Sequence, residues 1–273
     1  MRIELREVGH VYASGTALEV VALRGVSLSV EGGEVLAIVG GTGSGKSTLV
    51  QHLNLLLEPT SGKVLVDGVD ARSLDRGDLR RSVGLVFQAP EAALFAPTVW
   101  EDVAFAPRRM GLSEGGVRER VGGVLGRLGI GHLAQRAPHS LSGGEKRRAA
   151  IAGVLAMGPD VLVLDEPTAG LDPATREELL GVIRALRDEG GTVVLVSHDL
   201  DEVAEVADRV CLLENGAVTS LGKPEEVFYA VSASPMAPAT VRTAALLRDD
   251  HSGVGRPVSF GETLAALKTV LGA

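Results

Sequence analysis

Cysteine, aromatic side chains and long hydrophobic runs are all scarce in this sequence of 273 residues. The single cysteine, Cys211, leaves no intrachain disulfide and no cysteine-based metal cluster, and its place in an apolar run predicts a small buried hydrophobe in a reducing compartment. No apolar run approaches the roughly 20 residues that span a bilayer, and no secretory signal pattern is visible. We therefore expect any membrane role to depend on a partner.

Positive charge is also in short supply. The chain has 27 Lys and Arg against 35 Asp and Glu, a formal net charge of -8. Nucleic-acid-binding proteins usually carry a strong basic excess, so this balance argues against nucleic acid as the main partner. The length suits one large domain, or one domain with a small appendage.

A glycine-rich stretch follows directly after the apolar run Val35 to Val39. It matches G-x-x-x-x-G-K-[ST] and precedes a helical pattern, which is typical of a P-loop nucleotide site. Glycines let backbone N–H groups surround an anion, the following helix directs its positive end at it, and Lys46 adds a charge. We expect the Ser47 hydroxyl to bind Mg²⁺ on the phosphates. The predicted site residues are Gly40, Gly41, Thr42, Gly43, Ser44, Gly45, Lys46, Ser47 and Thr48.

Hydrophobic patterning predicts an α/β fold. Four runs are apolar on both faces, as in a parallel sheet covered by helices: Val35 to Val39, Val83 to Phe87, Val161 to Leu164 and Val193 to Val196. Alternating apolar residues within 1–30 and at 64–66 predict a small antiparallel layer beside them.

Helical spacing replaces the strand signal between Thr98 and Met157, which predicts an inserted helical subdomain at about 97–158. Another helix is expected at Thr175 to Glu189, ending at Gly190-Gly191. A turn-rich passage at 232–238 precedes two short helical patterns, at 241–247 and 262–271. We expect a nucleotide-binding domain over 1–230 and a helical extension over 231–273.

Polar groups follow each of the four buried runs, and ligands bind at the carboxyl ends of strands in such sheets. Successive side chains of an extended chain point in different directions, so we assign Asp165 to Mg²⁺ and Glu166 to the attacking water as general base. His198 is expected to join them, although a histidine after a strand is often structural. Gln88 is a candidate to orient water or to touch Mg²⁺.

A second glycine-rich segment, Ser142-Gly143-Gly144, precedes another helical pattern. Ser142 is a good N-cap and the glycines expose N–H groups, which predicts an anion site, with a plain capped helix as the alternative. Tyr12 is a candidate to stack on an adenine face, or else a partly buried aromatic of a Gly/Ser-rich loop.

Together these residues resemble the motifs of ATP-binding cassette (ABC) ATPases over nearly all of 1–228. The resemblance implies a P-loop NTPase with a mainly parallel core sheet, an antiparallel β subdomain and an inserted helical subdomain, binding ATP and Mg²⁺. It also implies head-to-tail pairing of two cassettes, so that Ser142, Gly143 and Gly144 of one bind the γ-phosphate held by the other. The matching motifs are the signature at Leu141 to Glu145, the Walker B end at Asp165-Glu166, the D-loop at Ala169 to Asp172, the Q-loop Gln88, the switch His198 and the A-loop Tyr12.

A narrower resemblance is to the ATPase subunits of energy-coupling factor (ECF) importers, which take up vitamins or transition metals. It rests on Gln88 to Glu91 with Leu94-Phe95, on Lys146-Arg147-Arg148 and on Asp165 to Pro173. It implies a peripheral protein at the cytoplasmic face of the cell membrane. The partners would be a second ATPase, identical or paralogous, a transmembrane coupling protein and a substrate-binding membrane subunit. Coupling helices would dock near residues 88–95, and the C-terminal helices would support dimerisation.

Two residues depart from the family pattern. Glu145 replaces the usual Gln, and because its charge is unfavourable near phosphates we expect it to contact the helix end instead. Leu55 stands where Gly is more frequent after Asn54, which concerns packing. The alternatives are an ABC importer that uses a soluble binding protein, a soluble ABC protein acting on ribosomes or DNA, and an assembly module with little hydrolysis. The sequence does not name the cargo, which the membrane subunits would select.

Overall fold

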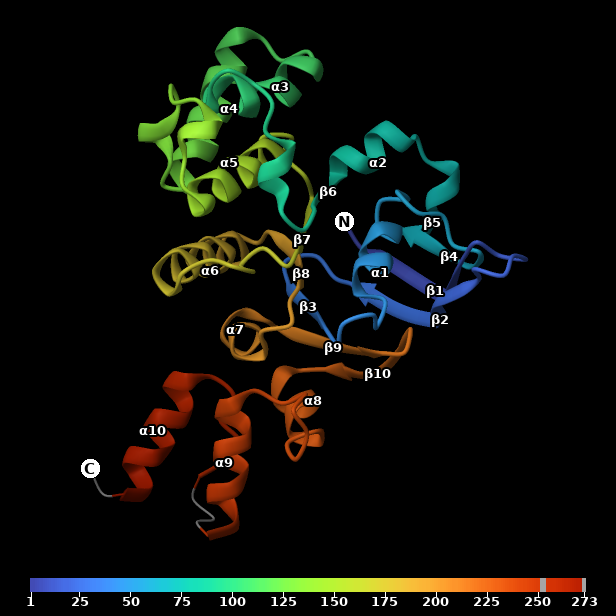
Figure 1. Cartoon of the computed structure of the whole chain (residues 1–273), viewed down its shortest axis with the longest axis vertical. Helices are drawn as coiled ribbons and strands as arrows, with labels where there is room; N and C mark the ends of the chain where they lie inside the picture. Colours follow the sequence, from blue (N-terminus) through green and yellow to red (C-terminus); the bar gives the residue numbers. More distant parts are fainter. Residues whose placement is uncertain (251–253, 272–273) are drawn as a thin grey trace.

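A six-stranded sheet forms the centre of the computed structural model, which describes residues 1–250 and 254–271 (Figure 1). Its strand order is β10-β9-β3-β8-β7-β6, with every neighbouring pair from β9 to β6 parallel. All four expected parallel strands are confirmed, and their carboxyl ends share one edge. The strands are β3 (Val35–Val39), β6 (Val83–Val86), β7 (Val161–Asp165), β8 (Thr192–Val196), β9 (Arg209–Glu214) and β10 (Ala217–Gly222).

The strands β9 and β10 were missed in the sequence. The apolar run around Cys211 was interpreted only as a buried environment for the thiol, because the run is short and has charged residues on both sides. In the structure β9 pairs in parallel with β3, and β10 returns antiparallel to it. The cysteine is buried as expected, and burial raises its pKa to about 12. The hairpin of β9 and β10 is important for the site because it lies against the P-loop.

A second, antiparallel sheet has the order β2-β1-β4-β5, which confirms the expected antiparallel layer. Its strands are β1 (Ile3–Tyr12), β2 (Val20–Val30), β4 (Ser61–Val66) and β5 (Val69–Asp70). A continuous apolar core joins this sheet, the helix α1 (Lys46–His52) and one face of the central sheet. Tyr12 is the last residue of β1, so its expected place in a loop was wrong.

Helices α3 (Val99–Arg109), α4 (Glu114–Arg127) and α5 (Gly143–Leu155) form the helical lobe at the top of Figure 1. Their apolar faces share one core with α6 (Pro173–Asp188) and the other face of the central sheet. The lobe joins β6 through the short 3₁₀ segment η2 (Pro90–Ala93). Three short helices were not predicted from the sequence, because seven residues are too few to show a helical period. They are α2 (Arg76–Ser82), α7 (Leu200–Val206) and α8 (Pro224–Ala230).

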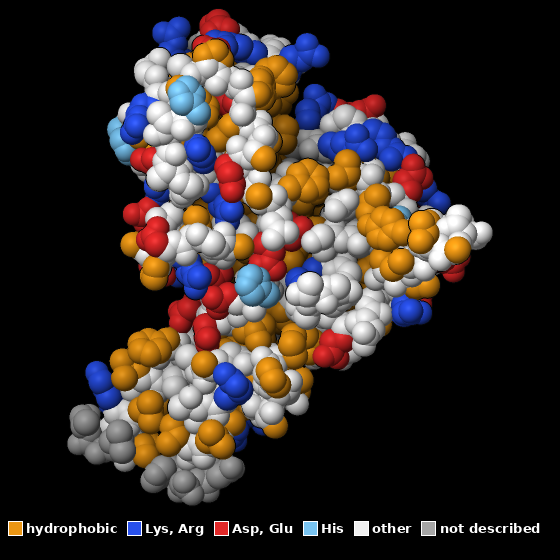
Figure 2. Space-filling model, in the orientation of Figure 1, with side chains coloured by type: hydrophobic (Ala, Val, Ile, Leu, Met, Phe, Trp, Pro, Cys, Tyr) orange, Lys and Arg blue, Asp and Glu red, His pale blue; other side chains and the backbone are white. Residues whose placement is uncertain are grey.

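The last two helices, α9 (Ala239–Asp250) and α10 (Phe260–Leu271), lie below the central sheet in Figure 1. Helices α7, α8 and α9 cover a third apolar core against β3 and β9, which Val258 joins just before α10. Residues 251–253 and 272–273 of the predicted extension lie outside the described residues. The side chains of Leu246, Phe260 and Leu264 remain exposed, and Figure 2 shows hydrophobic side chains gathered over this part of the surface.

Candidate functional site

The P-loop connects β3 to α1 and needs glycine where other backbone crowds it. A Cβ at Gly40 would overlap the carbonyl oxygen of Leu213 in β9, and one at Gly45 would lie 2.7 Å from the carbonyl oxygen of Ala22. Gly45 has a φ of 103° and caps α1 without a side-chain hydrogen bond, so no side chain in the described chain occupies the first N–H groups of α1. The loop is therefore shaped to present N–H groups to an anion.

Lys46 lies over this loop. Its Nζ atom donates hydrogen bonds to the carbonyl oxygens of Gly40 at 2.9 Å and Gly41 at 3.1 Å. These acceptors carry no charge, so they hold the ammonium group beside the loop without neutralising it. A phosphate placed there would meet both the N–H groups and a positive charge.

Asp165 ends β7 with a side chain that is 5% exposed. Its Oδ1 atom has no hydrogen-bond partner among residues 1–250 and 254–271. Burial raises the pKa of this carboxyl, the negative charge of Glu166 adds to the rise, and the Ser47 hydroxyl opposes it. A buried carboxylate oxygen without a donor beside a serine hydroxyl fits a divalent cation, which prefers oxygen ligands. The described chain holds no cluster of three or more His, Cys, Asp or Glu suited to a metal, so phosphates and water would supply the other ligands.

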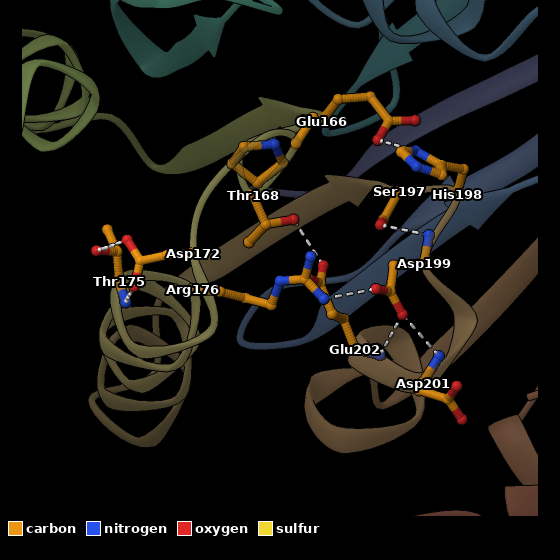
Figure 3. A network of polar contacts seen from close by, with 12 residues as sticks. Glu166, Thr168, Asp172, Thr175, Arg176, Ser197, His198, Asp199, Asp201 and Glu202 are labelled. Carbon is orange, nitrogen blue, oxygen red and sulfur yellow. Dashed lines mark hydrogen bonds and ion pairs between the residues drawn. The ribbon is translucent and has the colours of Figure 1, made fainter. Parts of the chain in front are cut away.

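Glu166 and His198 come together from the loops after β7 and β8 (Figure 3). The Nδ1 atom of His198 lies 2.6 Å from Oε2 of Glu166. Glu166 has a left-handed backbone with φ of 53°, and its N–H donates to the carbonyl oxygen of Val196 at 2.9 Å. Glu166 is therefore not part of an extended chain, which corrects the expectation that strand alternation separates its side chain from that of Asp165.

Gln88, another polar residue expected at this edge of the sheet, follows strand β6 next to β7. It is an exposed residue after the edge strand β6, and no hydrogen bond of its side chain is found within the described ranges. Tyr12 is closer to the P-loop, because its hydroxyl lies 3.2 Å from the Thr48 hydroxyl. The Tyr12 ring packs on His10, which in turn contacts the buried His52 of α1. Burial lowers the pKa of His52 to about 4, so it is neutral at physiological pH.

The second glycine-rich segment opens α5. Ser142 caps the helix by accepting from the N–H of Glu145, and the Glu145 carboxylate accepts from the N–H of Ser142 at 2.8 Å. The expectation that Glu145 turns to the helix end is confirmed. A Cβ at Gly143 would meet nothing within 4 Å, whereas one at Gly144 would overlap the Thr175 side chain of α6. No hydrogen bond joins 141–145 to residues 40–48 in the described chain.

The sequence analysis missed a buried link through Arg147 of α5. This side chain is 6% exposed and donates to the carbonyl oxygens of Pro167 at 3.1 Å and Ala169 at 2.7 Å. It also pairs with Glu91 of η2 at 3.3 Å. The only signal in the sequence was a basic run that an exposed helix face would explain equally well. Leu55 was likewise interpreted only in terms of packing, but its φ of 50° shows why glycine suits this position.

Comparison with known proteins gives consistent results. A family model described as ABC transporter matches residues 23–169. The chain is 49% identical, over 99% of its length and 97% of the relative's, to an energy-coupling factor transporter ATP-binding protein of Symbiobacterium thermophilum. It is 46% identical to a protein of the same description from Clostridium perfringens, over 85% of this chain and 83% of that one.

Solved structures agree. One is cbiO1 from Clostridium perfringens, described as part of the ABC transporter complex cbiONQ, with a TM-score of 0.78 and 40% identity over 92% of this chain and 97% of that chain. Another is a dimeric ATP-binding cassette in a post-hydrolysis state with ADP and phosphate bound, with a TM-score of 0.71 and 31% identity over 81% of this chain and 98% of that one.

Proposed function

This chain belongs to the ABC transporter family, and we propose that it is the ATP-hydrolysing subunit of an ECF-type importer that powers uptake of a vitamin or transition-metal ion. The family resemblance and the P-loop α/β fold expected from the sequence are confirmed. ABC proteins bind and hydrolyse ATP, so the chain is an ATP hydrolase. The observation that supports ATP hydrolysis is the Glu166–His198 pair beside Asp165, at the same sheet edge as the P-loop.

ATP would bind with its phosphates in the loop of residues 40–48 and its adenine against Tyr12. Ser47 and Asp165, with Gln88 from the segment after β6, would hold Mg²⁺. When bound, Mg²⁺ supplies positive charge that offsets the charge developing on the phosphates. Glu166 would accept a proton from the attacking water as general base. His198 is 68% exposed, so its free ring edge can face the γ-phosphate while Nδ1 holds the Glu166 carboxylate.

The signature segment would act on a second cassette. Ser142, Gly143 and Gly144 open α5 in the helical lobe, whereas the P-loop opens α1, and one similar cassette is solved as a dimer. In a head-to-tail dimer each segment would close the site of the other subunit. The exposed apolar side chains of α9 and α10 would add contacts between the two extensions, over residues 231–273.

Replacing Asp165 with Asn should separate cation binding from folding. Because burial raises the pKa of Asp165, the folded state disfavours its ionised form, so at neutral pH Asp165→Asn should leave the nucleotide-free protein as stable or more stable. The affinity for ATP in the presence of Mg²⁺ should fall at least about tenfold. Thermal denaturation and nucleotide titration with and without Mg²⁺ measure both. Asp160→Asn, at an exposed site before β7, is the control. Equal loss of affinity without Mg²⁺ would contradict the cation role.

An apolar groove of about 460 Å³ lies between η2, α3 and α5. Phe87 and Phe105 expose about half of their surface there. None of the described helices is long and apolar enough to cross a membrane. We assign the groove to a coupling helix of the transmembrane coupling protein, which would hold the chain at the cytoplasmic face of the membrane beside the substrate-binding subunit. The groove is lined by Leu85, Val86, Phe87, Ala89, Pro90, Ala92, Ala93, Leu94, Asp102, Phe105, Ala106, Ala150, Gly153 and Val154.

Filling the groove should uncouple the chain from its membrane partner. A Cβ at Gly153 of α5 meets nothing within 4 Å, so Gly153→Leu places a side chain in the groove without backbone strain. Copurification with the membrane subunits should be lost, while nucleotide affinity of the isolated chain should be unchanged. Gly122→Leu, on the exposed face of α4, is the matched control. Intact copurification of Gly153→Leu would place the docking surface elsewhere.

The proposed function as a whole is tested by purifying the chain from membranes and measuring phosphate release from the complex. Two further membrane proteins and ATP hydrolysis are expected. A chain that hydrolyses ATP but carries no membrane partner would support a soluble ABC ATPase instead.

A further inference from the structure

We propose that Glu202, acting through Thr168, and Arg176, acting through Asp199, are positioning residues that keep Glu166 and His198 aligned for hydrolysis. The inference rests on the roles proposed above for Glu166 and His198. It is based on a polar network next to that pair, in which Glu202 and Arg176 contact the loops after both β7 and β8 (Figure 3).

Arg147 binds two backbone carbonyl oxygens after Glu166, but within the described residues it makes no hydrogen bond on the His198 side, so the pair needs further support. His198 is mostly exposed, so packing does not restrict its ring. Glu166 adopts a left-handed backbone that non-glycine residues disfavour. One backbone hydrogen bond joins the two loops where they leave their strands, from the N–H of Glu166 to the carbonyl oxygen of Val196. Further restraint must come from the residues that follow each of them.

Glu202 supplies that restraint on the β7 side. It belongs to α7 and is 5% exposed. Its Oε2 atom accepts a hydrogen bond of 2.6 Å from the hydroxyl of Thr168, two residues after Glu166. Burial raises the pKa of Glu202, while the Thr168 hydroxyl and the charge of Arg176 oppose the rise. The carboxylate therefore holds the turn that carries Glu166.

Arg176 joins this contact to the β8 side. Its Nε atom lies 2.9 Å from Oε1 of Glu202, an ion pair whose atoms are not aligned for a hydrogen bond. Its Nη1 atom donates to Oδ2 of Asp199 at 2.9 Å. Asp199 directly follows His198, and its other oxygen caps α7 by accepting from the N–H of Glu202. One guanidinium group thus contacts both the carboxylate that holds the turn after β7 and the carboxylate that follows His198.

The network is anchored in two helices, α6 and α7. Arg176 lies in the first turn of α6, whose N-cap is Asp172. On its other side α7 contacts the C-terminal helices, where the N–H of Phe260 donates to Glu205 at 2.9 Å. A partly buried ion pair adds little stability compared with apolar side chains of similar volume, so stability alone does not account for it.

The test compares two double substitutions. In Glu202→Met with Arg176→Met both charges of the buried pair leave together. Asp199 loses Arg176, but its side chain is 31% exposed and still caps α7, so the chain should fold. The kcat for ATP hydrolysis should fall about tenfold or more, with the KM for ATP and the melting temperature little changed. The matched control is Glu177→Met with Arg184→Met, an ion pair on the exposed side of α6, which should hydrolyse ATP normally. Wild-type kcat in a folded Glu202→Met, Arg176→Met protein would overturn the proposal.

Thr168 provides a second test that leaves the ion pair in place. Thr168→Val removes the hydroxyl and keeps the shape of the side chain, so kcat should fall. Thr168→Ser keeps the hydroxyl, so its kcat should stay at the wild-type value. A fall in kcat for both, or for neither, would contradict positioning through this bond. Adding Thr168→Val to Glu166→Gln should cause no further loss, because the network acts through Glu166. If Glu166→Gln alone keeps full turnover, the assigned base is wrong, and this outcome is distinct from a failure of the network.

Discussion

Glu166→Gln is expected to bind ATP with wild-type affinity and to hydrolyse it at least about 10²-fold more slowly. The amide keeps the size of the side chain and can still accept a hydrogen bond from Nδ1 of His198, so the loop after β7 should be unchanged. It cannot accept a proton from water, so the chemical step should fail. Because ATP would persist in the site, the dimer closed by ATP should also last longer.

Phosphate release, nucleotide titration and size-exclusion chromatography with ATP measure these effects. Glu119→Gln, an exposed glutamate of α4, controls for the change of charge. Normal turnover in Glu166→Gln would show that another group activates the water.

The second large effect is expected at the signature segment, where two adjacent glycines should behave differently. Gly143→Ala adds a methyl group that meets nothing within 4 Å in this chain, at a helical position that tolerates Ala. The nucleotide-free protein should keep its stability. ATP-dependent dimerisation and hydrolysis should nevertheless fall about tenfold or more, because the methyl group would lie where the partner's γ-phosphate approaches the backbone.

Gly144→Ala should instead lose stability as well, because its Cβ would overlap the Thr175 side chain. Adding Thr175→Ser removes the crowding methyl group and should recover the melting temperature. Thermal denaturation without nucleotide and phosphate release with ATP distinguish the two effects. If Gly143→Ala dimerises and hydrolyses ATP normally, the segment does not approach a phosphate.

The parts of the site that could be predicted from the sequence are those that depend on residues close together in the chain. The P-loop is recognisable because an anion-binding turn needs glycines, a lysine and a helix start at fixed spacing. Strands β3, β6, β7 and β8 are recognisable because burial on both faces leaves no polar alternation. The polar residues after these strands could be assigned to one edge of the sheet because parallel strands place their carboxyl ends together.

The remaining features depend on residues far apart in the chain. Neither the bond from Arg147 to the turn after Glu166 nor the contact of Glu202 with Thr168 follows from any local spacing, since each joins segments 20 to 34 residues apart. The left-handed backbone of Glu166 is likewise set by the strand beside it. The sequence alone therefore determined which chemistry is present and at which edge of the sheet. Tertiary packing alone decided how the reacting groups are held, because that depends on which buried polar atoms the fold brings within bonding distance.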